Sequence, residues 1–292
     1  MRISTNALQK AALSAIFSAA LYAACIPCIK ILGKHVAPAF TGAFLYLGAG
    51  LGLMLTMLFK GVSVELALTK KEIPWAVSMV LLDTLAVCAL AAGVLLTSGA
   101  NVSLLGNFEL VATSCAAYLF FSEYISKRLF AAIILITIAS IVLSFEGAGS
   151  FVFNKGSALV LISCVCWGLE NNCTKRLSLK DTRQIAMIKG CFAGLFGLFA
   201  AFFAHNPLPQ LKWAILVMLT GFMSYGISVS LYIYAQRFLG AARAGAYYSA
   251  APFFGVVFSL LILNERPDVK FYIALLIMLA ASVLVILDTK NS

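Results

Sequence analysis

Residues 73–97 read IPWAVSMVLLDTLAVCALAAGVLLT, and Asp83 is the one charged side chain in this stretch. A helix needs about 20 mostly apolar residues to cross the hydrocarbon core of a bilayer. The composition of the whole chain is similarly apolar, at 62% hydrophobic and 11% charged residues. Soluble domains carry about 25% charged residues. The sequence therefore predicts an integral membrane protein.

Further apolar stretches of similar length lie on both sides of residues 73–97. Short loops separate them, and turn-forming or helix-breaking residues such as Pro38, Gly61, Pro207 and Pro267 mark these loops. The predicted fold class is therefore all-α integral membrane, with about ten transmembrane helices. The predicted spans are residues 8–33, 37–59, 73–97, 100–122, 127–146, 156–176, 184–205, 211–236, 240–263 and 269–288.

The basic residues predict the orientation, because Lys and Arg accumulate in cytoplasmic loops. Fifteen Lys and Arg residues lie on the side of the N-terminus and six on the opposite side. Both termini are therefore predicted to be cytoplasmic, in a multi-pass protein of the cytoplasmic membrane. The net charge of +10 comes from short tracts between spans, so the lipid bilayer, and no nucleic acid, is the predicted partner.

A comparison of the chain with itself indicates an internal repeat. With a shift of 145 residues Lys30 matches Lys175, and with a shift of 142 residues Glu123 matches Glu265. Because five is an odd number, a second copy of five spans starts on the opposite side of the membrane. Such inverted repeats build transporters with a substrate site near the midplane. The two predicted repeats are residues 8–146 and 155–288.

The ends of the fourth and ninth spans share a pattern. Phe121-Ser122-Glu123 closes the fourth span and Leu263-Asn264-Glu265 closes the ninth, and each is followed by basic residues and another apolar span. Pro252 lies within the ninth span. With these residues, the chain over about 8–288 resembles the drug/metabolite transporter superfamily, specifically its ten-helix EamA type.

The resemblance implies that each half is an EamA-like five-helix repeat. It also implies a central cavity lined by spans 1–4 and 6–9, with spans 5 and 10 as outer scaffold. Spans 5 and 10 carry almost no polar groups, and a helix that is apolar on all sides belongs against lipid or in deep packing. The family often has a proline midway along the fourth span, but this chain reads Asn107-Phe108-Glu109-Leu110 there.

Three carboxylates are predicted near the membrane midplane. They are Asp83 in the third span, Glu109 in the fourth and Glu170 in the sixth. A charged side chain at that depth costs at least about 2.5–3.5 kcal/mol, so each needs a reason to be there. A low dielectric favours the neutral form of a carboxyl group, so these groups are candidates for binding a cation or carrying a proton. The alternative is a structural ion pair or a hydrogen bond between helices.

Glu170 is the preferred candidate because of its neighbours. At helical spacing it shares a face with Trp167, Asn171 and Thr174. An indole ring attracts an amine through cation–π interaction. Tyr22 aligns with Trp167 in the repeat, so both halves offer an aromatic ring at a related depth.

Other polar residues complete the predicted substrate site. Asn107 and Glu109 are two residues apart, so they cannot both face one cavity squarely, and one of them is expected to hydrogen-bond a neighbouring helix. Tyr225 and Tyr232 in the eighth span and Tyr248 in the ninth belong to polar aromatic stripes, which serve either packing or binding.

The basic residues have competing interpretations. Lys30 and Lys175 lie near span ends, where snorkelling to the interface is expected. Lys189 and Arg243 can pair with acids or attract an anionic cargo. Glu123 and Glu265 lie beside Lys127-Arg128 and Arg266, which predicts structural pairs on the loop side.

An enzyme and a channel are the rival function classes. Cys25 and Cys28 form a C-x-x-C pair, which can shuttle disulfides, but the pair lies within an apolar span. The two histidines, His35 and His205, have no zinc ligand set around them. No P-loop, H-E-x-x-H or G-x-S-x-G motif is present, so no catalytic residue, metal or cofactor is predicted. A pore built by one chain leaves little signature in a sequence.

The sequence therefore predicts a secondary transporter that works by alternating access. The favoured cargo is a small cationic or zwitterionic amine, and Glu170, Glu109 and Asp83 are the candidates for proton coupling, which itself stays open. The alternative cargo is an anionic or sugar-like metabolite bound by Lys30, Lys189 or Arg243. The identity of the cargo, the direction of transport and the oligomeric state stay open.

Overall fold

The computed structural model describes residues 5–60, 70–121, 125–144, 154–177, 182–239, 247–248 and 250–289. Within these ranges the regular elements are all helices. Glu123 and Arg243 lie outside the described residues, and so does the side chain of Lys175. The roles predicted for these residues therefore stay predictions.

The described helices form ten segments that cross the bundle. The first five segments are α1 (Thr5–Ala23) with α2 (Cys25–Leu32), α3 (Pro38–Lys60), α4 (Ile73–Leu96), α5 (Gly99–Leu105) with α6 (Phe108–Phe121), and α7 (Lys127–Ser144). The second five are α8 (Lys155–Leu177), α9 (Thr182–Phe203), α10 (Leu211–Gly221) with the π-helix η1 (Phe222–Ile227) and α11 (Ser228–Leu239), α13 (Ala251–Leu263), and α14 (Val269–Thr289).

Length and composition agree with a membrane location. Six described stretches are long and apolar enough to cross a bilayer, and two shorter apolar helices, Ala251–Leu263 and Val269–Val285, accompany them. The six are Leu8–Leu32, Pro38–Thr56, Ile73–Leu96, Gly99–Phe120, Ile185–Phe203 and Leu211–Tyr232. Many large apolar side chains on the outside, such as Phe203 and Leu261, are exposed, as expected for helices that face lipid.

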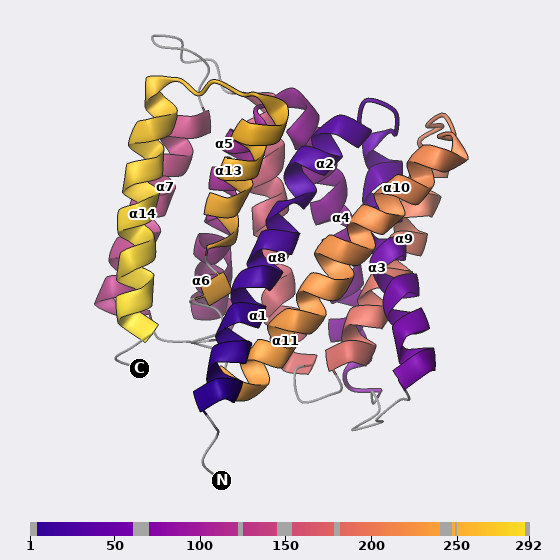
Figure 1. Ribbon diagram of the computed structural model, residues 1–292, viewed down its shortest axis with the longest axis horizontal. Coiled ribbons are helices and arrows are strands. Elements are labelled where there is room, and N and C mark those ends of the chain that lie inside the picture. Colours follow the sequence, from indigo (N-terminus) through magenta and orange to yellow (C-terminus); the bar gives the residue numbers. More distant parts are fainter. Residues whose placement is uncertain are drawn as a thin grey trace.

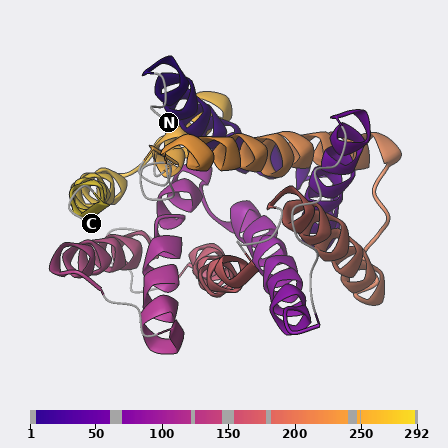
Figure 2. The same ribbon diagram turned by 90° about the horizontal axis from the view of Figure 1, so that it is seen from below.

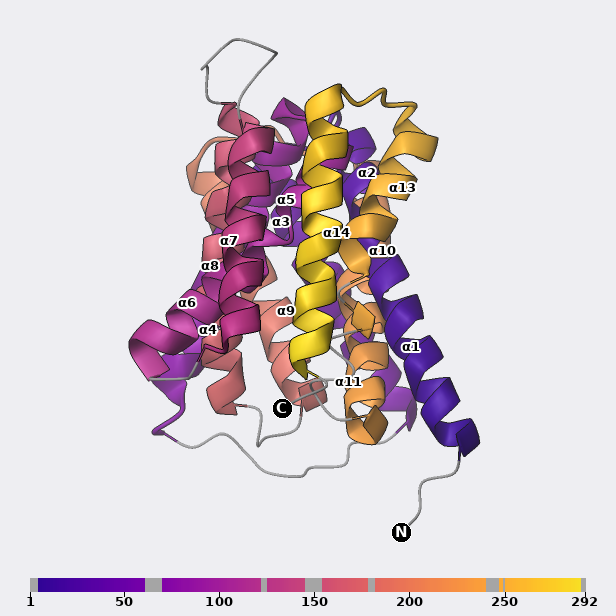
Figure 3. The same cartoon turned by 90° about the vertical axis from the view of Figure 1, so that its left-hand side faces the viewer.

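The start of α1 and the end of α14 lie at the same end of the bundle, which we call the terminal end (Figure 1). The opposite end, where α2 and α13 finish and α5 and α14 begin, is called the far end. Helices α7 and α14 pack against each other at one edge of the bundle (Figures 2 and 3). This agrees with the peripheral position implied for spans 5 and 10.

Two segments are interrupted halfway. Pro27 has no N–H to donate to the carbonyl of Ala23, and the first segment breaks at Ala24 between α1 and α2. The fourth segment breaks at Gly106 and Asn107 without a proline. There the Asn107 amide donates to the Leu104 carbonyl at 3.0 Å and the Glu109 amide donates to the Gly106 carbonyl at 3.1 Å. These bonds reach back three residues, as in a tightened 3₁₀ turn.

Glycines allow α3 to pack very closely on the eighth segment. A Cβ atom at Gly48 would overlap the backbone of Met218, and one at Gly221 would overlap the backbone of Leu45. At Gly52 an added Cβ would overlap the ring of Phe222, the first residue of η1. Small residues are the usual means by which membrane helices approach each other. The π-helix therefore lies where two backbones are in direct contact.

Candidate functional site

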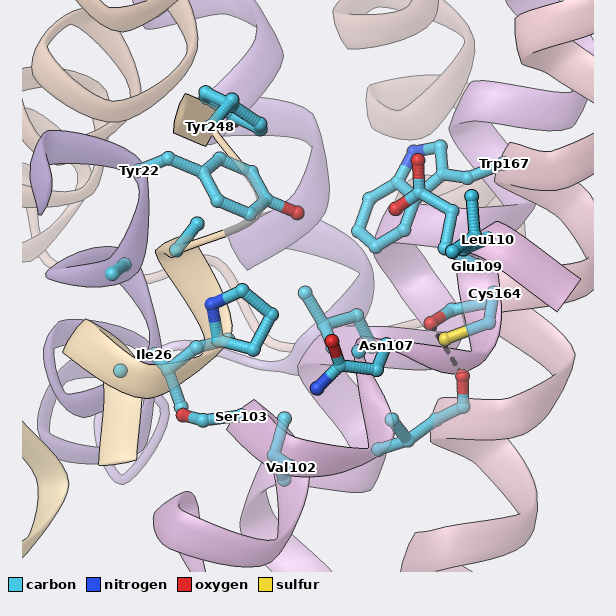
Figure 4. A pocket seen from close by; sticks show the side chains of 18 of the residues that line it. Tyr22, Ile26, Val102, Ser103, Asn107, Glu109, Leu110, Cys164, Trp167 and Tyr248 are labelled. Atoms are coloured by element: carbon cyan, nitrogen blue, oxygen red, sulfur yellow. Dashed lines mark hydrogen bonds between the residues drawn. The ribbon is translucent and has the colours of Figure 1, made fainter. Parts of the chain in front are cut away.

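A cavity of about 430 Å³ lies between the two halves of the chain. Its walls are mostly apolar, and a few polar side chains point into it (Figure 4). Seven of the ten predicted substrate-site residues line it: Tyr22, Asn107, Glu109, Trp167, Asn171, Tyr232 and Tyr248. Asp83, Glu170 and Tyr225 do not belong to the lining. An apolar pocket with a few convergent polar groups is the usual form of a small-molecule site.

Glu109 brings a carboxylate into the cavity wall. It lies in the first turn of α6, where the helix dipole favours a negative charge. Its Oε1 atom accepts a hydrogen bond of 2.7 Å from the side-chain amide of Asn171. In the ranges that the structure describes, no Lys or Arg side chain lies within ion-pair distance of Glu109. Its charge is therefore available to a positively charged ligand.

The expectation that Asn107 and Glu109 could not both face one cavity was wrong. That expectation assumed a continuous helix, but the break between α5 and α6 turns both residues to the lining. The side-chain amide of Asn107 (Nδ2) also donates to the Leu104 carbonyl at 3.0 Å and to the sulfur of Met278 at 3.4 Å. The Asn107 side chain thus also links the break between α5 and α6 to α14.

Aromatic rings face each other across the cavity. Tyr22 and Tyr248 lie on one side, and Trp167 lies with Glu109 on the other (Figure 4). The ring centroids of Tyr232 and Tyr248 are 4.7 Å apart, and those of Tyr22 and Tyr248 are 6.0 Å apart. Tyr and Trp ring faces attract cations. The cavity therefore combines one carboxylate with several faces that suit an organic cation.

Tyr225 lies behind this aromatic side. Its ring packs 5.6 Å from that of Tyr22 and 5.3 Å from that of Tyr46, measured between centroids. Its hydroxyl group is buried without a hydrogen-bond partner in the described part of the chain. Of the stripe predicted in the eighth span, Tyr232 reaches the cavity and Tyr225 supports its wall.

Asp83 and Glu170 meet Lys189 behind the Trp167 side of the cavity. The Nζ atom of Lys189 lies 3.1 Å from Asp83 Oδ2 and 3.1 Å from Glu170 Oε2. Both carboxylate side chains are closed off, with exposed fractions of 0% and 1%. We call these three residues the buried triad. For Lys189, the structure agrees with the interpretation that it pairs with acids.

Neutral donors complete the shell around the triad. The Tyr46 hydroxyl donates to Asp83 Oδ1 at 2.6 Å, and the Trp167 indole N–H donates to the same atom at 3.1 Å. The Thr174 hydroxyl donates to Glu170 Oε1. Trp167 therefore belongs to both groups, since it also lines the cavity. The three residues predicted to share one face, Trp167, Glu170 and Asn171, do not all reach the cavity. Trp167 and Asn171 line it, whereas Glu170 lies behind the wall.

A second ion pair lies at the far end. Lys30 Nζ is 3.0 Å from Glu265 Oε1 and donates to the Thr97 carbonyl at 2.6 Å. The Glu265 carboxylate also accepts from the backbone amides of Gly99 at 2.7 Å and Ala100 at 2.9 Å. These amides begin α5, where helical N–H groups have no partner within the helix. We call this arrangement the far-end clasp.

The far-end clasp corrects one expectation and agrees with another. Lys30 does not snorkel freely to the interface, and Glu265 forms the structural pair expected of it, with Lys30 as the partner. Sequence reasoning missed the pairing because the two residues are 235 positions apart. Ser98-Gly99 was a usable signal, since a helix that starts with small residues offers free amides to an acid.

The cavity walls also differ from the implied arrangement. Ile136 of α7 and Ser282 and Val285 of α14 contribute to the lining, although spans 5 and 10 were expected to be outer scaffold only. Among the described side chains, none from α3 or α9 belongs to the lining. These two helices instead carry Tyr46 and Lys189, which surround Asp83.

Comparison with known families agrees with this arrangement. The model of the EamA-like transporter family matches the chain twice, over residues 9–145 and 154–287. The chain belongs to the EamA-like transporter family. It therefore has the ten-helix repeat fold of a multi-pass membrane protein.

Two individual comparisons add detail to the family assignment. A protein of Methanothermobacter thermautotrophicus, described as an uncharacterized transporter, is 29% identical over 180 residues. This match covers 58% of the chain and 51% of the relative, so the chain spans about half the relative's length. A solved crystal structure, described only as that of a protein, superposes with a TM-score of 0.68 at 16% identity and covers 96% of this chain and 97% of its own. That likeness concerns the fold alone.

The cysteines of this EamA-like transporter are all free, and Cys25 is buried. Cys25 and Cys28 are followed by no second cysteine pair in the first half of the sequence. Among the described residues, no group of three or more His, Cys, Asp or Glu side chains could hold a metal ion. The cavity, rather than a thiol or metal centre, is thus the best candidate for function.

Proposed function

We propose that this EamA-like transporter is a secondary carrier for a small cationic or zwitterionic amine. The observation that carries the proposal is Glu109, a carboxylate in the cavity lining with no basic partner among the described residues. An ammonium group beside Glu109 would supply the missing charge. The aromatic rings of Tyr22 and Trp167 would face the organic part of the cargo.

The size of the cavity supports an organic cargo rather than a bare inorganic ion. Small-molecule pockets have volumes of about 300–1,000 Å³, and this cavity measures about 430 Å³. Most of its lining is apolar, including Ile26, Leu90 and Val102. A primary amine with an aromatic or branched apolar body matches these walls.

The positions of the basic residues argue against an anionic cargo. Lys30 is paired with Glu265, and Lys189 is paired with two carboxylates. No Lys or Arg appears in the described lining of the cavity. The anionic alternative therefore depends on Arg243, which lies outside the described residues.

The carrier works by alternating access in the cytoplasmic membrane with both termini in the cytoplasm. Two features support the orientation. The start of α1 and the end of α14 lie at one end of the bundle, and the 15-to-6 distribution of Lys and Arg supports an inside position for that end. The far-end clasp then lies on the outer side.

The test is a transport screen in proteoliposomes with a panel of primary aromatic amines, amino acids and organic anions. We expect wild-type protein to take up at least one amine, and Glu109→Gln to lower the affinity for it about tenfold or more, which corresponds to about 1.4 kcal/mol. Asp268→Asn is the matched control. This exposed residue accepts a bond from the Phe271 amide, which an Asn oxygen also accepts.

Two results would reject the proposal. One is uptake of organic anions only. The other is an unchanged affinity for every transported amine in the Glu109→Gln variant, with normal behaviour of the Asp268→Asn control.

A further inference from the structure

The buried triad has more negative than positive charge. It holds two carboxylates, from Asp83 on α4 and Glu170 on α8, and one ammonium group, from Lys189 on α9. Both carboxylate side chains are at most 1% exposed. The hydrogen bonds from Tyr46, Trp167 and Thr174 disperse this charge but do not change its sum. Within the described residues, the triad is therefore one positive charge short of neutral.

An uncompensated charge in the membrane interior is costly, because desolvation of a buried ion amounts to several kcal/mol after relaxation. One additional positive charge would remove this cost. A metal ion does not fit, since the ammonium of Lys189 already lies between the two carboxylates at 3.1 Å from each. No metal-binding group is found among the described side chains either. A proton is the remaining small cation.

We infer that the buried triad is the proton-binding site of the carrier and is separate from the cargo site at Glu109. The proton binds Asp83 Oδ2 and forms an O–H bond there, while Lys189 stays paired with the Glu170 carboxylate. Asp83 Oδ2 suits this role because Tyr46 and Trp167 both donate to the other oxygen, Oδ1, and its own contact, the Lys189 ammonium, is shared with Glu170. The inference rests on the proposed carrier function, since a coupling proton needs a cargo to be coupled to.

Trp167 and Tyr46 connect the triad to the cavity. The Trp167 indole donates to Asp83 Oδ1 while its ring lines the cavity. Tyr46 donates to the same oxygen, and its ring contacts Tyr225, which in turn contacts Tyr22 on the opposite wall. Neutralising Asp83 weakens the hydrogen bonds that both donors make, because bonds to a charged acceptor are stronger. Protonation of Asp83 therefore affects residues on both walls of the cavity, Trp167 on one wall and, through Tyr46 and Tyr225, Tyr22 on the other.

Other ionisable groups around Asp83 are few in the described structure. Tyr46 faces it from α3, Glu170 from α8 and Lys189 from α9, and Tyr225 of η1 stands behind Tyr46. Glu109 of α6 is held next to this region by Asn171. The Lys189 side chain, at 25% exposure, is the accessible member of the triad. Proton exchange would therefore pass Lys189, about two turns from the start of α9 at the terminal end.

The first experiment needs no cargo. Infrared difference spectra of the protein in lipid nanodiscs are recorded between mildly acidic and mildly alkaline pH. We expect the carbonyl stretch of a protonated carboxyl group, absent from Asp83→Asn and retained in Glu109→Gln. Glu170→Gln provides a second variant if Asp83→Asn does not fold, because it makes the triad neutral and should also abolish protonation. A band unchanged in both triad variants, or no band in wild type, would overturn the inference.

The second experiment uses the aromatic primary amine that wild-type proteoliposomes take up fastest. A gradient of one pH unit should support up to about tenfold accumulation if one proton moves per cargo. In Asp83→Asn, we expect exchange of labelled for unlabelled amine to continue while the pH gradient no longer drives accumulation. Accumulation equal to wild type in Asp83→Asn would refute coupling at the triad. If wild type transports no amine, the proposed function fails, while the infrared result still decides the proton site.

Discussion

Lys30 and Lys189 each sit in an ion-paired cluster, but the two clusters differ in charge balance. In the far-end clasp, one lysine meets one carboxylate, and backbone groups of Thr97, Gly99 and Ala100 satisfy the remaining positions. In the buried triad, one lysine meets two carboxylates. A balanced cluster is suited to holding helices together. An unbalanced cluster can change its charge by binding a proton. From this difference we assign a structural role to the far-end clasp and proton coupling to the buried triad.

The largest expected effect on stability comes from removing Lys189, the positively charged residue of the triad. Lys189→Met leaves Asp83 and Glu170 buried side by side without a counterion, and breaking a buried ion pair costs about 3–5 kcal/mol. We expect a large loss of thermal stability in detergent, measured by the retained fraction of folded protein on a sizing column. The double variant Lys189→Met with Asp83→Asn should recover much of the loss. A single variant as stable as wild type would show that the triad is not a charged cluster.

A smaller effect is expected at the far-end clasp. Glu265→Gln keeps an oxygen for the α5 amides but loses the charge, and a hydrogen bond to a charged group contributes about 1.5–3 kcal/mol. Amide hydrogen exchange of the segment around Gly99 and Ala100 should become faster, as measured by mass spectrometry. Asp268→Asn, on the same side of the bundle, is the control. If exchange in that segment does not change, Glu265 does not hold the start of α5.

The smallest effect is expected for Lys30→Met. The Lys30 side chain is 24% exposed, and its carboxylate partner keeps both backbone donors. Partly exposed ion pairs contribute about 0–1 kcal/mol. We expect a change in thermal stability clearly below that of Lys189→Met in the same assay. Equal losses for the two lysines would remove the distinction between a balanced and an unbalanced cluster.

The sequence predicted the fold better than the site because the two depend on different information. Apolar length and the order of repeated residues identify the ten segments, and both are local properties of the chain. Which carboxylate faces the cavity depends on residues far away in sequence. Glu170 was preferred for its neighbours on the same helix, yet Lys189 on α9 draws it away from the cavity. Glu109 was available by sequence, but its exposure depends on a helix break that no proline announces.

The break at Gly106 and Asn107 also shows why the missing family proline was a weak guide. Proline in that position would interrupt the helix by removing an amide donor. Here glycine and asparagine support a turn of the tighter type, in which the backbone amides of Asn107 and Glu109 donate to the carbonyls of Leu104 and Gly106. Different residues thus give an interrupted fourth segment that presents Glu109.

The π-helix η1 determines which way the side chains of α11, the helix that follows it in the eighth segment, point around the helix axis. A π turn takes up about one residue more than an α turn, and one residue corresponds to about 100° of rotation, given 3.6 residues per turn. Tyr225 within η1 therefore points towards Tyr46, while Tyr232 beyond it lines the cavity. Deleting one residue between Phe222 and Ile227 would restore an ordinary helix and swing Tyr232 out of the cavity wall. The number of residues in this short stretch, more than their chemical type, therefore sets where Tyr232 lies.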